Sequence, residues 1–519
     1  MKNLFTIVIA STLLYSCGSS QTKSEATTAI KTQVDITKYG KTITETELKT
    51  ALYKYASDEF QGRETGKPGQ KMAVNYLRDT YKSLGISAAK PDGNYFQDVA
   101  LEINDVPTVN ISNNGKEFKN IDDFVSVTSS GTGVISASEI VYAGFGIEDD
   151  NYNDFTNLEV KGKVVLIKSG EPKKEDGTFL ITGTTEASKW SNFRQQFASK
   201  RDVAKAKGAK TVLFYYPEVY AMASNRFGKS SGRMSLAGKA DEMYYFLINT
   251  ALAESLVKDI STSNTAKTIT TDLKIDYKNN SKPLQSENVA AFIKGSEKPD
   301  EIIVISAHLD HEGVKEGEIY NGADDDGSGT VAVLEIAEAF AEARKDGNGP
   351  KRSILFLNVT GEEKGLLGSA YYTDVDPIFP LANTVANLNI DMIGRTDPKR
   401  EKRNRDYLYL IGSDKLSTDL HNISEEANTK YMNIDLDYTF NDDNDPNRFY
   451  YRSDHYNFAK NNIPVIFYFN GTHDDYHQPS DTPDKIQYDL LENRTRLIFY
   501  TAWEVANRKD RLIVDKVAN

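Results

Sequence analysis

The sequence predicts an α/β fold: a mostly parallel mixed sheet with helices on both faces, interrupted by an inserted β-rich segment. Strand-like and helix-like segments alternate from residue 286 to the C-terminus, which is the pattern of a parallel sheet covered by helices. Acidic residues and histidines follow several of these strands, and all six histidines lie between His308 and His477. The predicted secondary structure also changes near Gly131, after which short strands dominate.

The composition is that of a globular protein and excludes nucleic acid as a partner. The chain has 519 residues, of which 39% are hydrophobic, and this length corresponds to about three domains. Its net charge of −13 is spread along the chain without a basic stripe that would neutralise phosphates. No pattern in the sequence specifies an oligomeric state.

The N-terminus predicts export. Met1–Asn3 and the apolar run up to Tyr15 indicate a signal peptide over residues 1–16, too short to span a membrane. Leu14–Gly18 resembles the cleavage box of bacterial lipoproteins, in which Cys17, the single cysteine, becomes the lipidated first residue. Residues 17–40 would then be a flexible tether to the cell envelope, expected at the periplasmic face of an outer membrane. Without lipidation of the cysteine, the alternative is a secreted protein.

Residues 41–130 are predicted to form the N-terminal part of the main domain. Two helices are expected between Thr44 and Ile86, separated by a glycine-rich turn, and Thr44 with Glu47 predicts a capping box. Weakly alternating residues over 96–130 indicate strands.

Residues 131–285 predict an inserted β-rich domain. Strands are expected at 135–143, 162–168 and 211–215, with a helix at 197–207. The stretches Tyr142–Ile147 and Val160–Leu166 resemble the protease-associated domain, a module found in exported peptidases. Its expected role is to shape or cover the site, and a plain spacer is the alternative.

Residues 286–519 are predicted to carry the catalytic chemistry on alternating elements. The expected strands are 301–306, 352–359, 384–390, 407–411 and 464–469, and the expected helices are 329–343, 364–372, 416–429, 454–460 and 490–506. Ligands of open α/β sheets bind beyond the carboxyl ends of the strands. The side chains that follow four of these strands are His308 with Asp310, Glu362 with Glu363, Asp391, and His477. Imidazoles and carboxylates without thiolates suit zinc.

The local spacing predicts which of these side chains can bind a metal ion and which can orient a ligand or act as a base. Asp310 lies two residues after His308, so in extended chain both point the same way and the carboxylate can orient the imidazole. A carboxylate of the glycine-flanked triple aspartate 324–326 can bridge two cations. Adjacent Glu362 and Glu363 cannot both face one metal, so one is free to act as a base.

These motifs also carry a family resemblance. The quoted residues are Ala307-His308-Leu309-Asp310, Asn321–Gly329, Gly361-Glu362-Glu363-Lys364-Gly365, Asn389–Met392 and Tyr476-His477. In this order they resemble the co-catalytic zinc aminopeptidases of the bacterial secreted and transferrin-receptor-like superfamily, and the resemblance covers residues 44–130 and 286–506.

The resemblance implies an exported exopeptidase with two zinc ions per chain, most simply an aminopeptidase acting on peptides through a zinc-bridged hydroxide. The implied ligands are His308 and Asp391 for one zinc, Glu363 and His477 for the other, and Asp325 as the bridge, with Asp324 as the alternative bridge. The implied catalytic residues are Glu362 as general base, Asp310 as the partner of His308, and Tyr476 as a hydrogen-bond donor to the oxyanion. Carboxypeptidase, aminoacylase or cyclase-like chemistry and a non-catalytic peptide-binding role remain open alternatives.

The other histidines and one acidic loop have structural interpretations. Ser453–Tyr456 predicts a helix cap followed by a packing or substrate-side histidine. His311 and His473 lie near the predicted rim without an assigned role, and His421 is expected to be structural or exposed. The loop 441–445 is expected to be solvated because its spacing matches no calcium-binding loop.

Overall fold

The computed structural model describes residues 34–128, 130–230, 232–238, 241–400 and 403–516. The chain divides into Met1–Ile36 and Thr37–Asn519, and all elements below belong to the second unit. The predicted signal peptide and Cys17 lie outside the described residues. No helix within the described ranges has the length and apolar character needed to cross a membrane.

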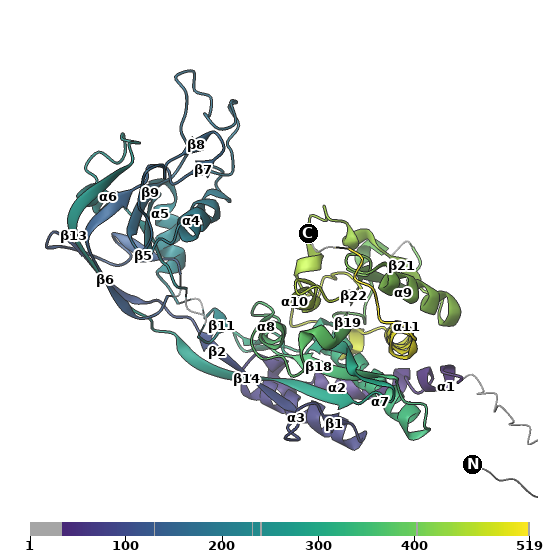
Figure 1. The fold of residues 1–519 in the computed structure, drawn as a ribbon. Coiled ribbons are helices and arrows are strands. Elements are labelled where there is room, and N and C mark those ends of the chain that lie inside the picture. The colour runs from purple at the N-terminus through teal and green to yellow at the C-terminus, as the bar shows by residue number, and fades with distance from the viewer. Residues whose placement is uncertain (1–33, 129, 231, 239–240, 401–402, 517–519) are drawn as a thin grey trace, which may run out of the picture. The chain divides into compact units, whose positions relative to one another are not determined.

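The larger sheet carries the predicted α/β architecture (Figure 1). In spatial order its strands are β11 (Met234–Leu236), β2 (Phe96–Ile103), β14 (Lys282–Ile293), β18 (Arg352–Val359), β15 (Lys298–His308), β19 (Thr384–Ile390), β22 (Val465–Phe469), β20 (Tyr407–Ile411) and β21 (Asp435–Asp437), with β1 (Ser87–Ala88) beside β14. Strands β18, β15, β19 and β22 are parallel to their neighbours in this series. Toward both edges the sheet contains antiparallel pairs, because β14 and β20 run opposite to the central strands and β2 runs opposite to β14. The sheet is therefore mixed, with its parallel part at the centre.

Helices cover both faces of this sheet, as predicted. They are α1 (Thr37–Gly40), α2 (Glu45–Tyr55), α3 (Pro68–Ser83), α7 (Gly329–Lys345), α8 (Leu367–Asp374), α9 (Thr418–Tyr431), α10 (His455–Ala459) and α11 (Tyr488–Asn507). Helices α2, α7 and α11 pack together on one face, while α8 and α10 pack on the other (Figure 1). Thr44 caps α2 by accepting from the Glu47 backbone N–H at 3.3 Å, and its hydroxyl donates to the Glu47 carboxylate at 2.7 Å.

A second sheet forms the inserted β-rich part, and it begins earlier than the boundary predicted at Gly131. Its strands in spatial order are β4 (Lys116–Phe118), β3 (Thr108–Asn113), β13 (Lys267–Lys278), β6 (Gly133–Tyr142), β9 (Val164–Lys168), β10 (Thr211–Tyr215), β12 (Tyr244–Ile248) and β5 (Phe124–Ser126). Helices α4 (Gln196–Ala206), α5 (Pro217–Phe227) and α6 (Thr250–Leu256) accompany it. Strands β3, β4 and β5 were expected in the main domain, but β3 pairs with β13 about 160 residues later, for example Ile111 with Ile275. Conversely, β11 falls within residues 131–285, which were predicted to form the insert, but it pairs with β2 of the larger sheet.

The last four residues of the predicted tether, Thr37–Gly40, form a helix that belongs to the folded unit. Helix α1 packs against α7 and α11, and Tyr39 stacks on Trp503 of α11 with ring centroids 5.8 Å apart. The hydroxyl of Tyr39 donates to Asp346 at 3.1 Å. Burial of this aromatic ring makes Thr37–Gly40 part of the folded unit, so the predicted tether boundary at residue 40 is too late.

Candidate metal centre

The centre of the larger sheet delivers the predicted side chains to one edge. His308 is the last residue of β15, Asp391 directly follows β19, and the loop after β18 carries Glu362 and Glu363. His477 lies in the loop after β22. Because these four neighbouring strands are parallel, their carboxyl ends meet at the same edge, as predicted.

One group of side chains surrounds the imidazole of His308. Its Nε2 lies 3.1 Å from Asp325 Oδ1 and 3.7 Å from Asp391 Oδ1, and all three side chains are buried. The other oxygen of Asp391 accepts a hydrogen bond from Ser453 Oγ at 2.6 Å. Asp391 therefore presents one oxygen to the group while the second is held by a hydroxyl.

A second group surrounds the imidazole of His477 and shares Asp325 with the first. Nε2 of His477 lies 3.0 Å from Asp325 Oδ2 and 3.1 Å from Glu363 Oε2. The two oxygens of Asp325 thus face different histidines. This is the arrangement expected of a carboxylate that bridges two cations.

Several polar atoms of both groups are buried without a hydrogen bond. His308 Nε2, Asp325 Oδ2 and Glu363 Oε1 have no hydrogen-bond partner within the described part of the chain. Buried polar atoms in folded proteins are almost always satisfied, so these atoms indicate a missing partner. Nitrogen and oxygen donors converging from several strands fit one or two metal cations, and the donor types fit zinc.

The three successive aspartates have separate contacts. Asp324 accepts from Gly394 N at 2.7 Å and from Ser328 Oγ at 2.9 Å, and its Oδ2 lies 3.1 Å from His473 Nε2. Asp326 accepts from the backbone N–H groups of His308, Gly329 and Met392, so both of its oxygens are occupied. The geometry therefore favours Asp325 over Asp324 as the shared residue.

Asp310 lies in the site but contacts His308 differently from the prediction. The Nδ1 atom of His308 is 3.0 Å from the Asp310 main-chain oxygen and 4.0 Å from its carboxylate. The carboxylate instead accepts from Thr65 Oγ1 at 2.7 Å and from Glu362 N at 3.2 Å. The chain leaves its extended path after His308, where β15 ends, so the same-side rule for strands no longer applies. Asp310 therefore orients the imidazole through its backbone and the Glu362 loop through its side chain.

Charge and burial perturb the titrating groups of the site. Burial raises the pKa of the Glu362 carboxyl, and the neighbouring Glu363 carboxylate raises it further despite the opposing effect of His308. Burial would lower the pKa of His477, but its contacts with the carboxylates of Asp325 and Glu363 outweigh burial and raise the pKa to about 10. Strongly shifted pKa values among neighbouring side chains are typical of functional sites.

A small cleft opens beside the two groups. It is lined by Asp325, Glu362 and Asp391, by Tyr476, and by an apolar wall of Met392, Phe449, Phe467 and Phe469. Tyr476 stacks on His477 with ring centroids 3.9 Å apart. Four of the predicted residues, Asp325, Glu362, Asp391 and Tyr476, therefore line one cleft that also has an apolar wall.

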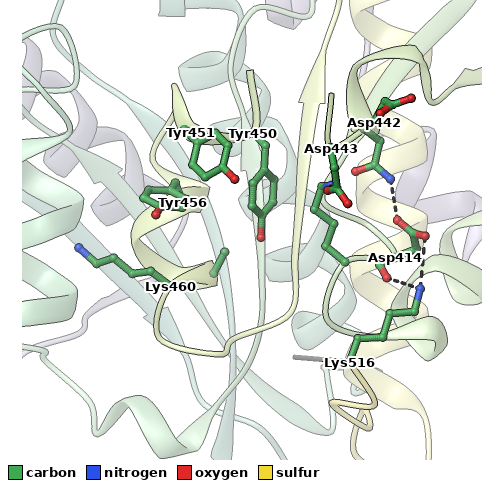
Figure 2. Close-up of a pocket in the computed structure, with 11 residues that line it drawn as sticks. Asp414, Asp442, Asp443, Tyr450, Tyr451, Tyr456, Lys460 and Lys516 are labelled. Atoms are coloured by element: carbon green, nitrogen blue, oxygen red, sulfur yellow. Dashed lines mark hydrogen bonds and ion pairs between the residues drawn. The ribbon is translucent and has the colours of Figure 1, made fainter. Parts of the chain in front are cut away.

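A larger cavity of about 650 Å³ is lined in part by Tyr450 and Tyr451 of the short 3₁₀ helix Phe449–Tyr451 (Figure 2). Tyr450, Tyr451 and Tyr456 line it opposite Asp414, Asp442 and Asp443. Lys516 pairs with Asp414 at 3.3 Å. None of the predicted catalytic or metal-binding residues lines this cavity.

The remaining histidines separate into structural and site-associated ones. His455 is buried and stacks on Phe467 at 4.7 Å, and burial lowers its pKa to about 3, as a packing residue requires. The cap predicted for Ser453–Tyr456 does not form, because Ser453 donates to Asp391 and the Asp454 carboxylate accepts from Ser369. His421 Nδ1 lies 3.1 Å from Ser413 Oγ, away from the site.

Two residues of the site, Thr65 and Ser453, were not predicted from the sequence, and His311 was placed near the rim without a role. His311 is fully buried with its Nδ1 2.8 Å from Glu363 Oε1. Thr65 and Ser453 hold the carboxylates of Asp310 and Asp391. His311 was detectable, since it directly follows Asp310, whereas the two hydroxyl residues lie in segments without any metal-binding pattern.

A comparison with known protein families finds a match in this part of the chain. Residues 288–502 match the model of peptidase family M28, and this segment contains every residue of the two groups. This segment therefore resembles an M28 peptidase domain, which agrees with the resemblance of the motifs to co-catalytic zinc aminopeptidases.

Individual relatives share only part of their length with this chain. A probable leucine aminopeptidase 2 of Aspergillus oryzae is 26% identical over 347 residues, which cover 66% of this chain and 56% of the fungal protein. A probable glutamate carboxypeptidase of Arabidopsis thaliana is 34% identical over 105 residues, 20% of this chain and 14% of the plant protein. The chain thus spans about half, or less, of the length of these curated relatives.

Similar solved structures include two bacterial aminopeptidases. An aminopeptidase from Aneurinibacillus sp. strain AM-1 has a TM-score of 0.48 at 20% identity and covers 93% of this chain and 98% of its own. A zinc aminopeptidase from Bacillus subtilis has a TM-score of 0.46 at 19% identity and covers 90% of this chain and 96% of its own.

Proposed function

We propose that this protein is a two-zinc exopeptidase, and specifically an aminopeptidase that removes N-terminal residues from peptides. The observation that carries the proposal is the shared carboxylate of Asp325, whose oxygens lie 3.1 Å from His308 Nε2 and 3.0 Å from His477 Nε2. The M28 match and the aminopeptidase names among its relatives support the same reaction class.

The proposed zinc ligands follow from the two groups. His308, Asp325 and Asp391 would hold one ion, and Asp325, Glu363 and His477 would hold the other. Bound there, zinc would supply Lewis-acid activation of a peptide carbonyl and of a water molecule.

Two side chains of the cleft would act on the substrate and the water directly. Glu362 is the proposed general base, because its backbone N–H is held by Asp310 and its side chain lines the cleft beside Asp325 and Asp391. Tyr476 lines the same cleft and is proposed to donate a hydrogen bond to the carbonyl oxygen as negative charge develops on it. The apolar wall would receive the side chain of the residue being removed.

We further propose that the protein is exported and lipid-anchored through Cys17, and that the second sheet is a protease-associated domain. The signal-like N-terminus and the Tyr142–Ile147 motif support these assignments. Radiolabelled fatty acid that appears in the wild-type protein but not in a Cys17→Ser variant would support the anchor, and equal labelling of both would contradict it.

The function is tested by offering zinc-loaded protein matched sets of free and N-acetylated peptides, with and without chelator. We expect stepwise loss of N-terminal residues from the free peptides alone, abolished by the chelator. Residues lost from the C-terminus instead would indicate a carboxypeptidase, and release of the acetyl group would indicate an aminoacylase. Intact peptides in the presence of bound zinc would overturn the peptidase assignment.

A further inference from the structure

His311 is a buried imidazole at the metal centre that the five-ligand assignment leaves without a role. Its side chain is fully buried, and neither ring nitrogen has a hydrogen-bond partner within the described residues. A buried, unsatisfied imidazole is costly, so its conformation requires a partner that the protein side chains do not supply.

The unsatisfied Nδ1 atom points at the second group. It lies 2.8 Å from Glu363 Oε1 and 3.8 Å from Asp325 Oδ2, and the ring centroid is 5.7 Å from that of His477. The short contact with Glu363 lacks hydrogen-bond geometry, since both atoms remain without a hydrogen bond. Donor atoms that crowd together without bonding one another are arranged around a common point, as metal ligands are.

The surrounding backbone holds the imidazole in this place. The His311 N–H donates to the Arg63 carbonyl at 3.4 Å, and the Arg63 guanidinium donates to the carbonyls of Asn321 and Gly322. A methyl group at Gly322 would lie 2.5 Å from His311 Cγ, so the glycine makes room for the ring. The neighbouring Glu312 is a weaker candidate because Lys315 and Lys364 neutralise its carboxylate.

We propose that His311 is a further metal ligand, which completes the second metal position together with Asp325, Glu363 and His477. This inference rests on the proposed two-zinc function. The second position then has four protein donors, as closed zinc sites do, whereas the position at His308 has three and keeps room for substrate and water. The two positions therefore differ in affinity, and the second fills first.

The test measures metal binding rather than activity. Wild-type protein, His311→Ala and His311→Gln are titrated with zinc in chelator buffers, and bound zinc per chain is measured by mass spectrometry. His421→Ala is the matched control, because it removes a histidine from helix α9 outside the site. Cadmium-113 resonances of the substituted proteins report the nitrogen ligands of each position.

We expect the wild type and His421→Ala to bind two ions in two steps. Both His311 variants should bind the tighter ion at least about tenfold more weakly, the scale of effect seen when support of a metal site is removed, and should shift one cadmium resonance. Thermal unfolding in chelator shows whether a variant is folded, and the glutamine variant preserves the side-chain volume. If the variants bind two ions with unchanged affinity and unchanged resonances, the proposed role of His311 is wrong, while the two-zinc function still stands. If the wild-type protein binds no zinc, both the proposed function and the proposed role of His311 are wrong.

Discussion

Replacing Glu362 by glutamine separates the chemistry of the site from its metal binding. The Glu362 carboxyl group makes no hydrogen bond or ion pair with another residue in the described part of the chain, so the substitution removes a proton acceptor and breaks no fixed contact. Its backbone N–H, which anchors the loop to Asp310 at 3.2 Å, is unchanged. We therefore expect the fold and the zinc content to be preserved.

The rate should nevertheless fall steeply, because glutamine cannot accept a proton. Loss of a general base costs about 10²- to 10⁴-fold, or about 3–5 kcal/mol of transition-state stabilisation. The loss should appear in kcat, with little change in KM, since Glu362 is assigned a role in proton transfer and not in substrate binding.

The adjacent Glu363→Gln variant is the matched control. Glu363 contacts His477 at 3.1 Å, so its substitution should lower zinc binding before it lowers the rate per bound zinc. Steady-state hydrolysis of a chromogenic amino-acid amide, with zinc measured on the same samples, distinguishes the two. A fully active Glu362→Gln variant, or one that has lost its zinc, would refute the assignment of Glu362 as the base.

Three further predictions concern the framework of the site. Thr65→Val removes the 2.7 Å hydrogen bond to Asp310 and should destabilise the protein by about 1.5–3 kcal/mol in urea unfolding; an unchanged midpoint would show that this bond is dispensable. Asp326→Asn replaces an acceptor of three backbone N–H groups and should lower both the melting temperature and the affinity for both metal ions in zinc titrations; a loss of only one ion would contradict this. Glu335, buried in α7, has a pKa raised to about 8 by burial and by Glu338, so the folded state retains its proton and stability falls as pH rises from about 4.5 to 8. Relative to wild type, Glu335→Gln should become more stable by about 2–4 kcal/mol across this window, and a difference that does not change with pH would refute the shift.

The elements of the catalytic part were predictable because their patterns are local. Strands β18, β19 and β20 begin and end where the sequence predicts, and the strand ends locate His308, Glu362 and Asp391. Buried parallel strands have continuous apolar sequences, so the polar residues that follow them are easily identified.

The limits of the inserted part depend on long-range pairing and were not predictable. Strand β3 belongs to the second sheet only because β13 lies beside it, and nothing in residues 108–113 specifies that partner. The contact of Asp310 with His308 was also missed in detail, because the direction of a carbonyl after a strand end depends on the turn that follows.

The triple aspartate shows why three identical residues need a structure to be told apart. Asp324 and Asp326 use their oxygens to tie the turn to the loops after β15 and β19, through Gly394 N in one case and His308 N and Met392 N in the other. Only Asp325 retains an oxygen without a hydrogen bond, and it lies between two residues whose positions are fixed. A single carboxylate can bridge two metals reproducibly only if its backbone is held rigidly, since a shift of about 1 Å would break the geometry that catalysis requires. Under the proposed assignment the two flanking aspartates would hold the bridging residue without binding a metal, which would explain why the motif carries three carboxylates.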